Sequence, residues 1–371
     1  MQRARVVVKI GSSSLVAPAG GLMRSKLRMV AREVDSLRQL GTEVLLVSSG
    51  AVAAGLGALR LRPGAVTLAE KQAAAAIGQG RLMDAYRGIF LPLGVEVAQV
   101  LLSRSELEHP RHVGHLRRAL QALMRHGVLP IVNENDTVAV EELRIGDNDT
   151  LAALLAVVAG ADLLVLLTDI DGFYDQDPRR SAAARRIAVV EAWTPRLAAA
   201  AGKAGSGVGT GGMRTKLTAA RIATAAGIDT VVARAEEGVL SSALRGDGIG
   251  TLFRGHPRPG PRREVWLRYG ARPRGRLILD DGAVAAVEGR QASLLLPGIT
   301  DCRGAFQAGD VVELATATER VIARGTALFG AQDLMRWLAL EGRPARRAVR
   351  VVQHRTMVMA REDLADGLEQ G

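Results

Sequence analysis

The sequence has a single cysteine and no long apolar run, and each absence excludes a class of protein. Cys302 alone cannot form an internal disulfide framework or a cysteine-rich zinc or iron–sulfur site. The longest apolar stretch, residues 151–161, ends at Asp162, well short of the about 18 residues that a membrane-spanning helix needs. Residues 1–5 lead directly into a short apolar run and show no signal-peptide core. We therefore expect a soluble, cytoplasmic and reduced protein.

Lysine is also scarce, although the chain is basic. The 49 basic residues exceed the 38 acidic ones and give a net charge of +11, but only five are lysines: Lys9, Lys26, Lys71, Lys203 and Lys216. Residues 254–276 hold eight arginines against Glu264 alone, a local charge of +7. A basic surface that attracts nucleic acid is therefore expected at most in that segment.

The length of 371 residues and the 48% hydrophobic content predict two domains with a sizeable core. Short Val/Leu/Ile-rich runs alternate with segments of helical period, such as residues 23–40, 113–123 and 215–226. The runs predict strands at residues 5–10, 43–47, 95–102, 128–132, 163–167 and 229–233. We expect an α/β fold with an open, mostly parallel sheet sandwiched by helices.

The pattern changes at residues 246–262, which are rich in Gly, Pro and Arg and are typical of a linker. Beyond them, short alternating runs predict a small, mostly β domain, at residues 264–269, 276–279, 284–287 and 311–314. The expected domains are residues 1–255 and 262–360.

Polar and glycine residues follow four of the predicted strands, at residues 9–14, 48–55, 133–136 and 168–172. Each group alone is also what an ordinary turn or helix cap contains. Because the carboxyl ends of parallel strands meet at one edge of a sheet, four such groups together favour a ligand-binding edge.

Lys9 ends an apolar strand, where an unpartnered ammonium is costly unless the side chain reaches solvent. Residues 205–216 form a glycine-rich loop that precedes a predicted helix and ends in Lys216. No strand precedes the loop and no Gly-Lys-Ser/Thr occurs, so it is neither a dinucleotide fingerprint nor a Walker A loop. It is either a flexible surface loop or a phosphate site that delivers amides and Lys216 to an anion.

Residues 146–150, Gly-Asp-Asn-Asp-Thr, precede another helix and can serve as its cap. Acidic residues beside the two lysines would orient them and bind magnesium through phosphate or water. Two other clusters are set aside as metal sites. The four aspartates from Asp169 to Asp177 lack the EF-hand glycine and closing glutamate, and Pro110 interrupts the histidines between His109 and His115.

Six segments, in order, resemble the amino-acid kinase family and within it the members that phosphorylate glutamate. They are VVKIGSS (7–13), SSGAVAAG (48–55), NENDTVA (133–139), GDNDTLAA (146–153), LLTDIDGFYDQDPR (166–179) and GTGGMRTKL (209–217). Residues 262–360 resemble the PUA domain, an RNA-associated barrel. The resemblance implies the amino-acid kinase fold plus a small, mostly-β, PUA-like barrel at the C-terminus.

The resemblance also implies roles for single residues. It makes Lys9, Lys216 and Asp149 catalytic, the lysines neutralising the transferring phosphoryl group. It assigns glutamate to Ser49, Gly50, Ala51, Asn133, Asp136 and Asn148. It assigns ATP to Lys9, Gly11, Thr168, Asp169, Thr210, Gly211, Gly212, Met213 and Lys216. No protein metal ligand is assigned.

The activity so implied is ATP-dependent phosphorylation of the L-glutamate side-chain carboxylate to L-glutamyl 5-phosphate, the first step of proline biosynthesis. ATP and Mg²⁺ are the expected cofactors, proline a feedback inhibitor and a homo-oligomer the expected assembly. Two alternatives stay open. One is an RNA-binding factor, suggested by the arginine-rich segment and the PUA-like domain. The other is a kinase of the same fold with another substrate.

Overall fold

The computed structural model describes residues 4–16, 21–61, 66–138, 148–176, 178, 181, 183–194, 197, 212–289, 294–339 and 350–357. The chain forms two compact units. The first comprises residues 1–105 and 116–259, and the second comprises residues 106–115 and 260–371. Each unit contains its own main sheet.

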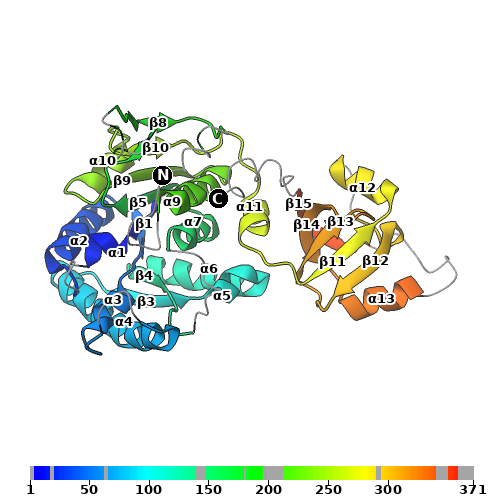
Figure 1. Ribbon diagram of the computed structural model, residues 1–371, viewed down its shortest axis with the longest axis horizontal. Coiled ribbons are helices and arrows are strands. Elements are labelled where there is room, and N and C mark those ends of the chain that lie inside the picture. The colour runs from blue at the N-terminus through cyan, green and yellow to red at the C-terminus, as the bar shows by residue number, and fades with distance from the viewer. Residues whose placement is uncertain are drawn as a thin grey trace. The chain divides into compact units, whose positions relative to one another are not determined.

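The first unit is built on an eight-stranded sheet (Figure 1), in which all neighbouring strands are parallel except β9 and β10. In spatial order the strands are β3 (Val97–Leu102), β4 (Leu129–Glu134), β2 (Glu43–Val47), β1 (Arg5–Ile10), β5 (Leu163–Thr168), β9 (Asp229–Arg234), β10 (Thr251–Phe253) and β8 (Val189–Val190). All six predicted strands are present, displaced by at most two residues at either end. The predicted open, mostly parallel sheet is confirmed.

Helices cover both faces of this sheet, as its apolar strands require. The helices of the unit are α1 (Ser12–Leu15), α2 (Arg24–Gln39), α3 (Ala51–Leu56), α4 (Leu68–Phe90), the 3₁₀ helix η1 (Leu91–Leu93), α7 (Asn148–Ala159), α9 (Met213–Ala225) and α10 (Val239–Arg245). Two further helices, α5 (Arg104–Glu108) and α6 (Pro110–Arg125), include residues assigned to the second unit.

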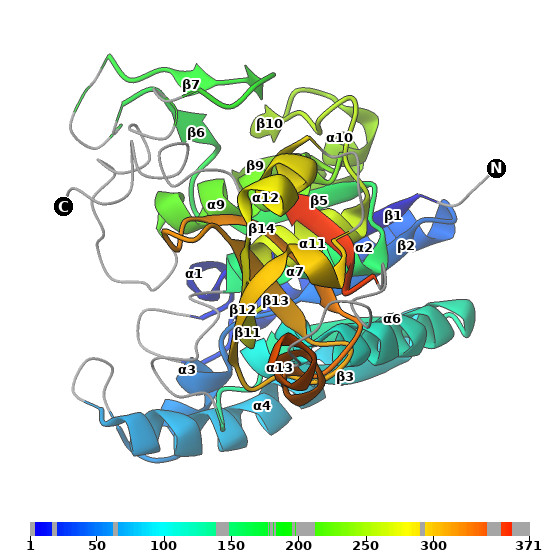
Figure 2. The same cartoon turned by 90° about the vertical axis from the view of Figure 1, so that its right-hand side faces the viewer.

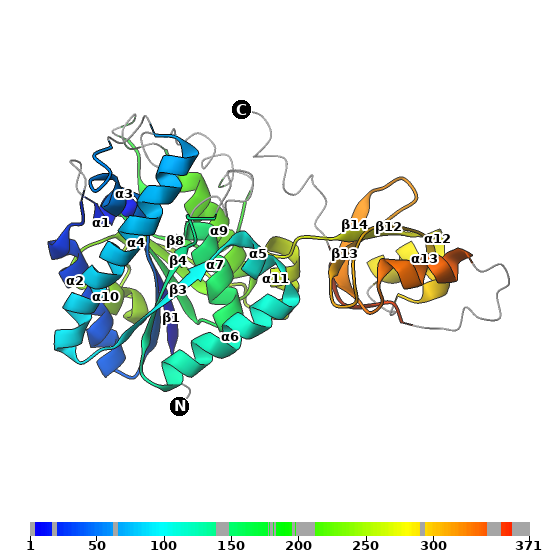
Figure 3. The same cartoon turned by 90° about the horizontal axis from the view of Figure 1, so that it is seen from below.

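The alternation of side chains along β1 decides which residues meet which helices. Val6, Val8 and Ile10 lie in one core cluster with residues of α2, α4 and α10. Lys9 has the opposite parity and therefore faces α7 and α9, which pack on the other face of the sheet (Figure 3). The position of Lys9 in β1 therefore directs its side chain toward the N-termini of α7 and α9.

Two glycines allow α3 and α4 to pack in close contact. A Cβ atom at Gly78 would lie 1.8 Å from the backbone oxygen of Ala51, and one at Gly55 would lie 1.9 Å from that of Ala74. Real Cβ atoms do not approach backbone oxygens so closely, so any side chain here would force the helices apart. This contact fixes α4 beside the loop that follows β2.

The second unit has a five-stranded sheet in the order β12 (Ile299–Gly304), β11 (Gly275–Leu279), β13 (Val311–Ala315), β14 (Val321–Ala327) and β15 (Val352–Met357). Its helices are α11 (Arg262–Tyr269), α12 (Asp281–Glu288), η3 (Leu296–Gly298) and α13 (Ala331–Ala339). The apolar face of the sheet packs with α12 and α13 in a separate core. The predicted strand-rich C-terminal domain is confirmed.

Two of the short runs predicted as β structure are helices. Residues 264–269 lie in α11, which begins after Pro261, and residues 284–287 lie in α12. The side chain of Asp280 accepts a hydrogen bond from the Ala283 amide at 2.7 Å and caps α12. Alternation over four to six residues was too short a signal to distinguish a strand from a helix, and in α12 the cap at Asp280 favours the helix.

The predicted linker at residues 246–262 is also more structured than expected, because it contains β10. This strand pairs antiparallel with β9 and parallel with β8. A two-stranded hairpin of β6 (Phe173–Tyr174) and β7 (Arg186–Ile187) lies near it (Figure 2). Within the described ranges, no helix is long and apolar enough to cross a membrane.

Candidate active site

Four strands end side by side at one edge of the large sheet. In the β-sheet register, Lys9 is opposite Val47 of β2 and Leu166 of β5. The amide of Ser48 donates to the Val132 carbonyl, which places the end of β4 beside the end of β2. The segments predicted to form a ligand edge are therefore neighbours in space.

Lys9, Asp149 and Lys216 form a buried ion cluster at this edge. Lys9 Nζ lies 2.6 Å from Asp149 Oδ1, and Lys216 Nζ lies 3.0 Å from Asp149 Oδ2. Asp149 is fully buried, and the two lysines are 4% and 5% exposed. Three charges that are far apart in the sequence are therefore held in contact by β1, α7 and α9.

The carboxyl of Asp149 stays ionised in this cluster. Burial is the largest single influence and opposes ionisation, but the ammonium groups of Lys9 and Lys216 together hold the pKa of Asp149 below its ordinary value. The cluster brings two ammonium groups to one carboxylate at the ligand edge. Two adjacent cations suit this place to bind an anion such as a phosphate group.

The N-terminus of α9 adds hydrogen-bond donors beside this cluster. Gly212 is its N-cap residue and makes no side-chain cap, since it has no side chain. Thr215 donates its hydroxyl in hydrogen bonds to Asp149 Oδ2 and to the Gly212 carbonyl, and so ties the first turn of α9 to the cluster. The helix dipole and the backbone amides at the N-terminus of α9 favour an anion at the same place.

A second, uncharged network lies at the ends of β2 and β4. Asn148 Nδ2 lies within hydrogen-bonding distance of three acceptors, which share its two hydrogens: the Ser48 carbonyl, Ser49 Oγ at 2.8 Å and Asn133 Oδ1 at 3.0 Å. Asn133 in turn donates to Gln79 of α4 at 2.9 Å. Three residues predicted to bind the substrate, Ser49, Asn133 and Asn148, are therefore joined directly.

The loop after β2 begins with a strained turn. Gly50 has φ +100° and is the N-cap residue of α3, whose first residue is Ala51. Only glycine adopts this left-handed conformation readily. The turn places the backbone of Gly50 and Ala51 next to the network of Ser49 and Asn148.

The remaining predicted residues lie around these two networks. Thr168 ends β5, is buried, and donates to Asp169 Oδ1 at 3.0 Å, while Asp169 itself is exposed. Gly11 follows β1, and a Cβ atom there would lie 3.7 Å from Lys9 Nζ. Met213 is the first residue of α9. Asp136 lies half-buried in the turn after β4.

Some of the predicted residues cannot be placed. Thr210 and Gly211 lie outside the described residues, as do Gly146 and Asp147.

Three residues of these networks carried no assigned role from the sequence. Thr215 lies in the segment GTGGMRTKL (209–217), in which Lys216 but not Thr215 was assigned a role. Gln79 and Tyr86 lie on α4, and Tyr86 shares a 2.8 Å hydrogen bond with Ser48 Oγ. Burial raises the pKa of the Tyr86 phenol far above its ordinary value. The sequence signal for Gln79 and Tyr86 is that they are polar residues among mostly apolar ones on the buried side of α4.

The acidic and histidine clusters that were set aside have protein partners. Asp171 accepts a hydrogen bond from the Tyr174 hydroxyl, and Asp175 accepts one from the Arg185 amide. His109 Nε2 lies 3.1 Å from Asp310 Oδ1, within the second unit. Among the described residues, no group of three or more His, Cys, Asp or Glu side chains is placed to hold a metal ion. Asp177 lies outside the described residues.

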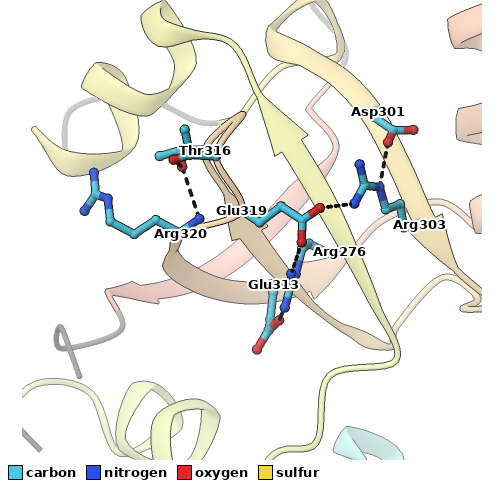
Figure 4. Close-up of polar contacts among 8 residues, drawn as sticks. Arg276, Asp301, Arg303, Glu313, Thr316, Glu319 and Arg320 are labelled. Atoms are coloured by element: carbon cyan, nitrogen blue, oxygen red, sulfur yellow. Dashed lines mark hydrogen bonds and ion pairs between the residues drawn. The ribbon is translucent and has the colours of Figure 1, made fainter. Parts of the chain in front are cut away.

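Arginines of the basic segment form ion pairs with acidic residues. Arg254 pairs with Asp229 in the first unit, and Arg276 pairs with Glu313 at 2.8 Å in the second. Glu319 accepts from both Arg276 and Arg303 on the same sheet (Figure 4). Part of the +7 charge is therefore compensated locally, which weakens the expectation of a basic patch.

Comparison with known proteins gives matches over most of the chain. The chain matches the amino acid kinase family over residues 4–234 and the PUA domain over residues 275–352. Glutamate 5-kinase of Carboxydothermus hydrogenoformans is 46% identical over 334 residues, 90% of this chain and 89% of that protein. Glutamate 5-kinase of Streptomyces coelicolor is 46% identical over 97% of this chain and 96% of that protein. A solved UMP kinase from Bacillus anthracis aligns with a TM-score of 0.48 and 18% identity, over 68% of this chain and 96% of that chain.

Proposed function

The chain belongs to the amino acid kinase family, in its glutamate 5-kinase branch, and we propose that it transfers a phosphoryl group from ATP to the side-chain carboxylate of L-glutamate. The product is L-glutamyl 5-phosphate, and the reaction is the first step of proline biosynthesis. The expectation of a glutamate-phosphorylating enzyme agrees with relatives that match over nine-tenths of the chain. We assign residues 1–255 to the catalytic domain and residues 262–360 to the PUA domain.

The buried cluster of Lys9, Asp149 and Lys216 is the observation that carries this proposal. The attacking group is a carboxylate, which is already ionised at neutral pH, so no general base is required. Catalysis then depends on positioning the two reactants in line and on neutralising the negative charge of the transferring phosphoryl group. The lysines supply that charge, and Asp149 holds both in place.

The network at the ends of β2 and β4 suits an amino-acid substrate. Ser49, Asn133 and Asn148 present amide and hydroxyl groups of defined orientation. We assign the glutamate site to these residues with Gly50 and Ala51 of the adjoining turn. Asp136, the acidic residue of the turn after β4, is suited to the α-ammonium group.

The ATP phosphates are assigned to Lys9, Gly11, Lys216 and the start of α9 at Gly212 and Met213. Thr168 and Asp169 are assigned to the nucleotide, together with Thr210 and Gly211. Mg²⁺ usually takes one or two protein ligands and fills its shell with water and phosphate oxygens, and it lowers the charge repulsion within ATP. The donor set fits that mode, because the described residues offer isolated carboxylates rather than a cage.

The test is a hydroxamate assay, which traps the reactive acyl phosphate, over glutamate, aspartate, acetylglutamate and carbamate. We expect ATP-dependent product with glutamate only. Product with another acceptor and none with glutamate would assign the chain to a different kinase of the fold.

Two further properties are proposed because the family has them. Adding proline to the same assay tests feedback inhibition, and light scattering tests the proposed homo-oligomer.

RNA binding by the second unit is a separate candidate function, supported by the PUA match over residues 275–352. An electrostatic contribution predicts affinity that falls steeply with salt and that survives loss of Lys9. A filter-binding titration of the whole chain with structured RNA measures it. Absence of binding at low salt would reject this function and leave the kinase proposal untouched.

A further inference from the structure

Gln79 is a polar side chain in a closely packed, largely apolar environment. It lies in the middle of α4 and is only 8% exposed, next to Gly78, where the helix contacts the backbone of Ala51. A buried amide is costly unless its hydrogen-bonding groups are satisfied. Among the residues that the structure describes, Gln79 has a hydrogen-bond partner at only one end of its amide.

The orientation of the Gln79 amide follows from a chain of hydrogen bonds. The backbone amide of Glu134 donates to Asn133 Oδ1 at 2.9 Å, which identifies that atom as the oxygen. The other end of Asn133 is therefore the NH₂ group, and it donates to Gln79 Oε1 at 2.9 Å. Gln79 must accept this bond with its oxygen, so its Nε2 group points away from Asn133.

In the described part of the chain, each end of this network has an amide atom with no hydrogen-bond partner. Among the described residues, Gln79 Nε2 has no hydrogen-bond acceptor and Asn148 Oδ1 has no donor. The orientation of Asn148 is fixed in the same way, because its Nδ2 donates to the Ser48 carbonyl. The amides of Gln79, Asn133 and Asn148 are thus connected, and they leave one buried donor and one acceptor unused.

An amino acid with a free carboxylate supplies the missing partners. We propose that Gln79 is a substrate-binding residue whose Nε2 group donates to a carboxylate oxygen of glutamate, while Asn148 Oδ1 accepts from the α-ammonium group. This inference rests on the proposed function. A neutral amide holds a carboxylate without adding a further cation beside Lys9 and Lys216. Asn133 aligns the donor and the acceptor, since each lies one hydrogen bond from its amide.

The substitution Gln79→Glu tests the donor alone. It keeps the size of the side chain and an oxygen that accepts from Asn133, and it replaces the Nε2 donor by a second oxygen. We expect the KM for glutamate to rise about 10–100-fold, the scale of a lost hydrogen bond to a charged group. The KM for ATP should change little. Gln39→Glu, an exposed residue at the end of α2, is the matched control and should leave both KM values unchanged.

Ligand-induced thermal shifts provide a second readout that does not need turnover. In Gln79→Glu and in the apolar isostere Gln79→Met, glutamate should no longer raise the melting temperature, whereas ATP still should. A normal KM for glutamate in Gln79→Glu, or equal loss of the response to both ligands, would overturn the inference. If the unsubstituted protein does not phosphorylate glutamate, the proposed function fails first, so the two failures are distinguishable.

Discussion

Lys9 Nζ lies 2.6 Å from Asp149 Oδ1, although the strands β2, β3 and β4 and the helices α2 to α6 lie between β1 and α7 in the sequence. The second oxygen of the same carboxylate receives Lys216 Nζ from α9 at 3.0 Å. A single buried carboxylate therefore sets the distance between two ammonium groups. We therefore expect both lysines to contact one polyphosphate chain.

Replacing either lysine should affect turnover more than binding. Lys9→Ala and Lys216→Ala each remove a charge that stabilises the transferring phosphoryl group, so we expect kcat to fall about 10²–10³-fold. Steady-state kinetics in the hydroxamate assay measures it. Lys26→Ala is the control, because Lys26 is an exposed lysine that donates only to the Ala235 carbonyl among the bonds described. An unchanged kcat in either cluster variant would contradict the assignment.

Asp149→Asn should lower both activity and stability, with a defined dependence on pH. Its folded-state pKa lies below the ordinary value, so the stabilisation is complete above the ordinary carboxyl pKa of about 4 and is lost as the pH falls through the folded-state pKa. At pH 7 the substitution removes the carboxylate charge that both buried ammonium groups contact, and we expect a loss of about 3–5 kcal/mol.

Denaturant unfolding of Asp149→Asn and the unsubstituted protein, at pH values from 3 to 8, measures this difference. The gap between the two free energies of unfolding should be constant above about pH 5 and should narrow at lower pH. A gap that is the same at every pH would mean that the carboxylate charge is not what stabilises the cluster.

Asp136→Ala should raise the KM for glutamate more than the KM for ATP. The substitution removes the acidic side chain of the turn after β4, and we expect the α-ammonium group to lose its charged partner, an effect of about 10–100-fold. Asp84→Ala, an exposed aspartate on α4, is the control. A rise confined to the KM for ATP would place Asp136 in the nucleotide site instead.

The sheet could be read from the sequence because buried parallel strands are apolar on both faces and are bounded by glycine and polar residues. β1 and β2 coincide with the predicted ranges. Because the carboxyl ends of parallel strands meet at one edge of a sheet, the meeting of Lys9, Ser49, Asn133 and Thr168 there also follows from the sequence. The residue types at the strand ends were therefore sufficient to predict which side chains meet at that edge.

The rest of the site depends on contacts between elements that no local pattern records. Gln79 is seven residues before Tyr86 on α4, and both reach strand ends only because Gly55 and Gly78 let α3 and α4 approach. In the second unit, the short run at residues 284–287 alternates like a strand, but the cap at Asp280 makes it a helix. Tertiary packing and capping decided these cases.

Gly78→Ala should disrupt both the fold and the glutamate site. The added methyl group would lie 1.8 Å from the Ala51 carbonyl oxygen and 2.6 Å from the Gly55 amide nitrogen, and both are backbone atoms that cannot rotate away. We expect a loss of about 1–3 kcal/mol from overpacking. The displaced α4 should also carry Gln79 away from Asn133, so the KM for glutamate should rise with the loss of stability.

Gly80→Ala is the matched control on the same helix, because a Cβ atom there meets nothing within 4 Å. Alanine is the better helix former by roughly 0.5–1 kcal/mol, so this substitution should stabilise the protein and leave the KM for glutamate unchanged. Thermal unfolding and kinetics of the two variants give opposite signs if close packing of α3 against α4 positions Gln79. Equal changes in stability and in the KM for glutamate at Gly78 and Gly80 would show that alanine acts only through its higher helix propensity.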